Sequence, residues 1–137
     1  ATRQSLVALN DVVTRFPGTR YARDARLKLD LALDHLAGKE MAIGRYYLRK
    51  QQYVAAINRF RTVVSNFQTT SQVPEALHRL VEAYVAIGVR GEAQQAAAVL
   101  GYNYPGSRWY QESYALMTGT ELPAAPGGSW LDDLFAH

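Results

Sequence analysis

The chain contains no cysteine among its 137 residues. This absence excludes a disulfide framework, a cysteine nucleophile and a metal site built from thiolates. The sequence also lacks any run of about 18 apolar residues, so it predicts no membrane-spanning helix. It starts at Ala1 in a helical pattern, without a methionine or the pattern of a signal peptide. We therefore expect a fragment of a longer chain, with any targeting signal outside it.

The common catalytic motifs are missing as well. The sequence holds no Gly-x-Ser-x-Gly, no glycine-rich phosphate loop and no His-Glu-x-x-His. His35, His78 and His137 lie far apart, and we expect each to be an ordinary helix-surface or tail residue rather than a ligand or base. These absences predict a protein that is not an enzyme and that binds no metal and no cofactor.

Charge is present but unevenly distributed. Residues 1–62 carry 12 Lys or Arg against 5 Asp or Glu, whereas residues 63–137 carry 3 against 7. The first half is therefore basic and could meet an acidic partner. Its basic residues form no dense run and few aromatic residues are interleaved with them, which disfavours nucleic-acid binding. A small enzyme or a nucleic-acid binder is the alternative class, and the missing motifs disfavour it.

Apolar residues recur every three or four positions almost throughout, which predicts an all-α fold. Proline, glycine and polar turns divide this pattern into seven expected helices. The first ends near Phe16, and Gly38 is expected to separate a second from a third. Gly88 and Gly91 bracket a later turn. The expected helices after the first cover about 20–37, 39–50, 53–67, 74–87, 92–103 and 108–117.

The helices also repeat. Pro-Gly-Thr-Arg-Tyr at 17–21 returns as Pro-Gly-Ser-Arg-Trp at 105–109, and in each the Thr or Ser should cap the next helix while the aromatic enters its core. Aligning Tyr47 with Tyr84 also aligns Ala56 with Ala93, a period of 37 residues close to that of tetratricopeptide repeats. We expect antiparallel helix hairpins forming a short solenoid over 1–117, a linker over 118–128 and a short amphipathic tail over 129–137.

The run from Gly44 to Phe60, GRYYLRKQQYVAAINRF, resembles the C-terminal tetratricopeptide repeats of the BamD family. The members of this family are lipoproteins of the bacterial outer-membrane β-barrel assembly machinery. The resemblance extends over about 1–117 and departs at Phe67-Gln68, where the family has Tyr-Pro.

The resemblance implies a scaffold at the periplasmic face of the outer membrane. Its partners would be the POTRA region of BamA and other subunits of the machinery, and its membrane attachment would be a lipid anchor outside this fragment. The alternative within the same class is another periplasmic tetratricopeptide adaptor, which would bind a peptide or a TolA-like partner in its concave groove.

The candidate partner-binding residues belong to the basic first half. Arg45 and Arg49 are one helical turn apart, while Arg59 and Arg61 flank Phe60 and lie off the apolar stripe. Both should therefore reach solvent or a partner, and a solvated charged face is the ordinary alternative for any one of them. The resemblance places Asn58 and Arg59 at the family position that faces BamA. It implies that Arg59 pairs with a POTRA carboxylate, supported by Asn58 and Arg49 at the rim.

Overall fold

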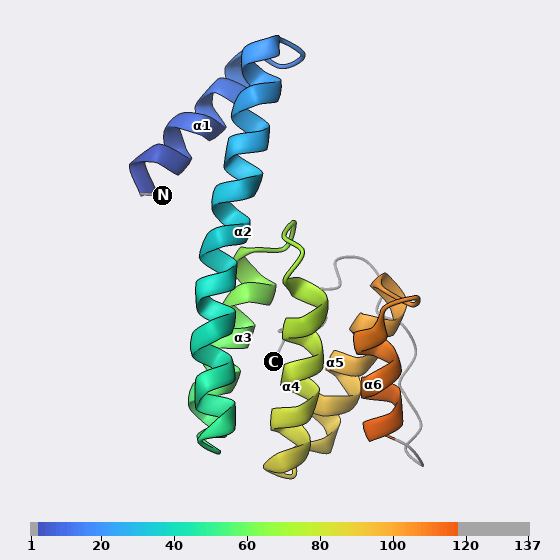
Figure 1. Cartoon of the computed structure of the whole chain (residues 1–137). Coiled ribbons are helices and arrows are strands. Elements are labelled where there is room, and N and C mark those ends of the chain that lie inside the picture. Colours follow the sequence, from blue (N-terminus) through green and yellow to red (C-terminus); the bar gives the residue numbers. More distant parts are fainter. Residues whose placement is uncertain (1–2, 118–137) are drawn as a thin grey trace.

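The computed structural model describes residues 3–117, and this part of the chain consists of six α-helices and their connecting turns (Figure 1). The expected all-α fold is confirmed. The linker expected at 118–128 and the tail expected at 129–137 lie outside the described residues. The helices are α1 (Arg3–Arg15), α2 (Arg20–Arg49), α3 (Tyr53–Asn66), α4 (Val73–Ala86), α5 (Arg90–Asn103) and α6 (Arg108–Leu116).

Each helix packs against the next one in the sequence, and α4 also contacts both α2 and α6. The contacts of α4 with α2 and α6 mean that successive hairpins stack side by side, as in tetratricopeptide-like repeats. Figure 1 shows the result: α1 folds back along the first half of α2, while α3 to α6 continue the stack from its second half. No helix within residues 3–117 combines the length and apolarity needed to span a bilayer.

The expected break at Gly38 is wrong, because α2 runs without interruption through 30 residues. A glycine inside a helix costs only about 1 kcal/mol relative to alanine, which the packing of a long helix easily exceeds. Gly91 likewise lies within α5, so only Gly88 takes the left-handed turn between α4 and α5, with φ of 81°.

The two repeated turns agree only in part. Thr19 accepts a hydrogen bond from the Ala22 amide and Ser107 accepts one from the Trp109 amide, so both predicted helix caps are confirmed. The expected burial of both aromatics is not: Trp109 packs against the core, but Tyr21 is 80% exposed. Tyr21 sits in the first turn of α2, at the end of that helix that lies beside α1 and away from α3 to α6 (Figure 1).

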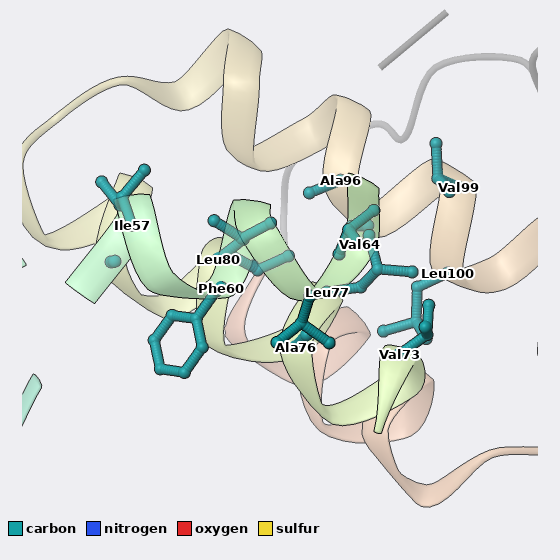
Figure 2. Packing of buried hydrophobic residues seen from close by; sticks show 14 of the residues in the cluster. Ile57, Phe60, Val64, Val73, Ala76, Leu77, Leu80, Ala96, Val99 and Leu100 are labelled. Atoms are coloured by element: carbon teal, nitrogen blue, oxygen red, sulfur yellow. The ribbon is translucent and has the colours of Figure 1, made fainter. Parts of the chain in front are cut away.

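The hydrophobic core lies between α3, α4 and α5 and the second half of α2. Figure 2 shows side chains of α3, α4 and α5 meeting there. Gly44 on α2 and Ala56 on α3 are both buried, as a close helix approach requires. The space beside Gly44 is occupied by the Phe60 ring, since a Cβ on Gly44 would lie 2.5 Å from Phe60 Cε1. The fully buried residues from α3, α4 and α5 include Phe60, Val63, Val64, Val73, Leu77, Leu80, Val81, Val99 and Leu100.

Candidate partner-binding surface

Arg59 projects from α3 toward α2 and forms an ion pair within the chain. Its Nη1 donates to the two carboxylate oxygens of Glu40, at 3.1 Å and 3.4 Å. The Arg59 side chain is still 41% exposed, so it reaches solvent as expected. Glu40 therefore fixes the direction of the guanidinium while leaving part of it accessible.

Asn58, Arg49 and Arg61 are all exposed, but they do not share one position. Asn58 directly precedes Arg59 on α3, and Arg49 is the last residue of α2. Arg61 reaches the neighbouring helix, where it donates a hydrogen bond to Tyr84 on α4. Burial raises the pKa of the Tyr84 hydroxyl, and Arg61 partly opposes this rise.

Arg45 lies on a different side of α2 from Glu40, since five residues correspond to a rotation of roughly 140°. Its Nη1 donates to both carboxylate oxygens of Glu75 on α4, at 3.1 Å and 3.2 Å. The five predicted residues therefore do not form one cluster. The structure brings Asn58 and Arg59 together on α3, and directs Arg45 and Arg61 toward α4.

A network of charged side chains on α4 continues from the Arg45–Glu75 pair. Arg79 Nε donates to Glu75 at 3.1 Å, and Arg79 Nη1 donates to Glu82 at 2.8 Å. These pairs follow the helical spacings of four and three residues, so the sequence contained the signal for them. No residue type in this network suggests a functional site, so sequence reasoning does not single it out.

His78 contradicts the expectation of a surface histidine, since it is only 4% exposed. Its Nδ1 lies 2.7 Å from the Ser113 hydroxyl on α6, and its Nε2 lies 3.5 Å from Glu82. Burial lowers the pKa of His78, while the nearby carboxylates of Glu82 and Glu112 oppose that shift. Of the other histidines, His35 is exposed as expected, and His137 lies outside the described residues.

The contact of serine, histidine and glutamate superficially resembles a hydrolase site. Ser113, however, has no exposed surface, so no substrate can reach its hydroxyl. The arrangement instead ties α6 to α4. Among residues 3–117 there is also no group of three or more His, Cys, Asp or Glu placed to hold a metal ion.

Two open pockets adjoin the charged network on α4, and both are lined by Glu82 and Leu116. Together we call them the α2–α4–α6 groove. The polar end has a volume of about 580 Å³, and there the guanidinium groups of Arg79 and Arg108 lie 5.3 Å and 4.3 Å from the centre of the Trp109 ring. The apolar end, about 370 Å³, is lined by Leu48, Tyr53, Glu82, Val85, Ala86 and Leu116.

Comparisons with known proteins add to this geometry. The profile of the YfiO family, described as an outer membrane lipoprotein, matches residues 1–100. The outer membrane protein assembly factor BamD of Caulobacter vibrioides is 58% identical over 125 residues, which cover 91% of this chain and 41% of that protein. The protein of the same name from Rickettsia prowazekii is 56% identical over 110 residues, covering 80% and 44%.

More distant relatives give the same result. The BamD of Neisseria meningitidis serogroup A is 36% identical over 107 residues, or 78% of this chain and 40% of that protein. The chain thus spans about two fifths of the length of the relatives it matches. The family profile covers well over half of the chain. The resemblance of the Gly44–Phe60 run indicates the same family. This chain belongs to the BamD (YfiO) family of outer membrane lipoproteins.

Proposed function

We propose that this chain is a non-enzymatic scaffold module of outer-membrane protein assembly, and that it acts at the periplasmic face of the outer membrane. The observation that carries the proposal is the 58% identity to a relative named as an outer membrane protein assembly factor. A fold of stacked helix hairpins supports it, because such repeats present extended surfaces to protein partners. The comparisons favour this function over a TolA-binding adaptor.

The more specific proposal is that Arg59 docks on the POTRA region of BamA. Arg59 is held by Glu40 and keeps an exposed edge, so it is oriented before a partner arrives. A guanidinium can donate to a second carboxylate through its remaining N–H groups, which suits it to an interface anchor. Asn58, exposed beside it, and Arg49 would contribute at the rim.

Calorimetry with the isolated POTRA domain at low salt tests the role of Arg59. Truncating one partner of a desolvated charge pair costs about 2–5 kcal/mol, whereas a rim charge costs much less. We expect Arg59→Glu to weaken binding by about tenfold or more with the helix content unchanged. Arg61→Glu, on the same helix and directed toward Tyr84, is the matched control and should have a smaller effect.

Glu40→Gln separates binding from folding. This change removes the internal ion pair but keeps the Arg59 side chain, so most of the affinity should remain. Equal affinity of the native chain and Arg59→Glu would contradict the docking role of Arg59. If Glu40→Gln weakens binding as much as Arg59→Glu does, Arg59 acts through the fold rather than through the interface.

A further inference from the structure

The apolar end of the α2–α4–α6 groove is open to solvent although four helices contribute apolar side chains to it. Leu48 comes from α2, Tyr53 from α3, Val85 and Ala86 from α4, and Leu116 from α6. A volume of about 370 Å³ is within the range of sites that bind small ligands or a few large side chains. The groove therefore has the size and chemistry to accept an apolar segment.

The chain itself continues from the edge of this groove. Leu116 is the last residue of α6 and lines both ends of the groove, so the described chain ends one residue beyond the groove lining. Residues 118–128, which lie outside the described part, include three Gly, two Pro and two Ala. At about 3.3–3.6 Å per residue, these eleven residues reach up to roughly 36–40 Å, which is ample to return to the groove.

The residues beyond this linker have the pattern of a helix that binds in a groove. In a helix, Trp130, Leu131, Leu134 and Phe135 would share one face, because they lie at positions i, i+1, i+4 and i+5. So short a helix is marginal alone and needs an apolar surface. Amphipathic helices commonly bind by laying such a face into an apolar groove.

In such a helix, the charged residues of this segment would lie away from its apolar face. Asp132 and Asp133 fall between the apolar residues of this segment, on what would be its outer side. They would therefore face solvent, away from Glu82 and the apolar lining, when the apolar face lies in the groove.

From these observations we propose that residues 129–135 of this chain bind in the α2–α4–α6 groove and place their apolar face on Leu48, Tyr53, Val85 and Leu116. The short linker gives the segment an effective concentration near the millimolar range, so weak contacts suffice. The groove would then be occupied by the chain's own C-terminal segment, and an external peptide would have to displace it.

Disulfide trapping in the full chain tests this proposal, because the native chain has no cysteine to interfere. One variant carries Ala86→Cys in the groove and Ala136→Cys directly after the segment. The matched control carries Tyr102→Cys, exposed on α5 outside the groove, with the same Ala136→Cys. Under mild oxidation, the groove pair should form an intrachain disulfide about tenfold faster than the control pair.

Replacing both Trp130 and Leu134 by Ser should make the groove pair and the control pair form their disulfides at the same rate. A second measurement uses the variant that carries Ala86→Cys as its single cysteine. A bulky thiol reagent should modify this cysteine several-fold more slowly when Trp130 and Leu134 are intact than when both are replaced by Ser. Equal trapping rates, or a modification rate unaffected by the two Ser substitutions, would overturn the proposal. Disulfide-linked dimers in place of monomers would overturn it too, since they would identify a second copy as the occupant.

Discussion

At the scale of single residues, His78 is a buried titratable group that joins two helices of the described chain. Its ring contacts Ser113 on α6 through Nδ1, and Nε2 lies 3.5 Å from Glu82 and 3.7 Å from Glu112. Burial disfavours the charged imidazolium, so the neutral ring is the form that the folded chain stabilises. One hydrogen bond between α4 and α6 thus involves a ring that is kept neutral by burial.

The burial of His78 predicts a loss of stability in mildly acidic solution. The folded pKa of His78 lies below its ordinary value of 6.5, so the unfolded chain takes up the proton first as the pH falls. The free energy of unfolding should then decrease from about pH 6.5 down to the folded pKa, by at most about 1.4 kcal/mol per pH unit for one proton. Urea unfolding at a series of pH values between 7.5 and about 5 measures this slope.

His78→Gln should flatten the decrease, because glutamine does not titrate. His35→Gln, at an exposed position on α2, is the matched control and should leave the slope as it is. A slope that is the same in all three proteins would show that the His78 ring is not the group responsible.

At the scale of helices, the two glycines of α2 illustrate opposite roles of one residue type. A Cβ on Gly44 would collide with the Phe60 ring at 2.5 Å, whereas a Cβ on Gly38 would meet only the Gln72 side chain at 3.9 Å. Neither glycine has a positive φ. Gly44 therefore allows α2 and α3 to approach closely, while Gly38 only weakens the helix.

The same substitution should thus have opposite effects at these two positions. We expect Gly44→Ala to lower the free energy of unfolding by about 1–3 kcal/mol through overpacking against Phe60. Gly38→Ala should raise it by about 0.5–1 kcal/mol, because alanine is the better helix former. Urea unfolding of both variants gives the two values, and destabilisation by Gly38→Ala would mean that α2 needs a flexible point there.

The sequence predicted those features of the helices that depend on local spacing. The apolar period, the Thr19 and Ser107 caps and the small residue at Gly44 all act within one or two turns. The break at Gly38 was wrong because a turn and a tolerated helical glycine look alike in sequence.

The candidate site was less predictable because its contacts join distant segments. Glu40 lies 19 residues from Arg59, and Glu75 lies 30 residues from Arg45, so no local pattern paired them. The partner of buried His78 is likewise distant, because Ser113 lies 35 residues away. The sequence predicted that Arg59 reaches solvent, but not that Glu40 orients it.

At the scale of the whole molecule, burial is concentrated in one part of the described chain. No residue of α1 is buried, and between Ala25 and Ala37 no residue of α2 is buried either. In contrast, α4 buries seven residues and α5 buries six. Within residues 3–117, α1 packs only against α2, whereas α4 packs against α2, α3, α5 and α6.

This distribution predicts that the two parts open independently. Local opening costs least where few apolar contacts are lost, so amides of α1 and of the first half of α2 should exchange by small fluctuations. Amides of α4 and α5 should exchange only with global unfolding. Hydrogen exchange followed by mass spectrometry should therefore show protection at least about tenfold lower in α1 than in α4, which corresponds to roughly 1.4 kcal/mol or more.

Raising the urea concentration below the unfolding midpoint should accelerate exchange strongly in α4 and only slightly in α1, because only global opening exposes a large surface. Uniform protection with one common urea dependence would contradict this prediction and would mean that α1 and α2 unfold together with the core as one cooperative unit.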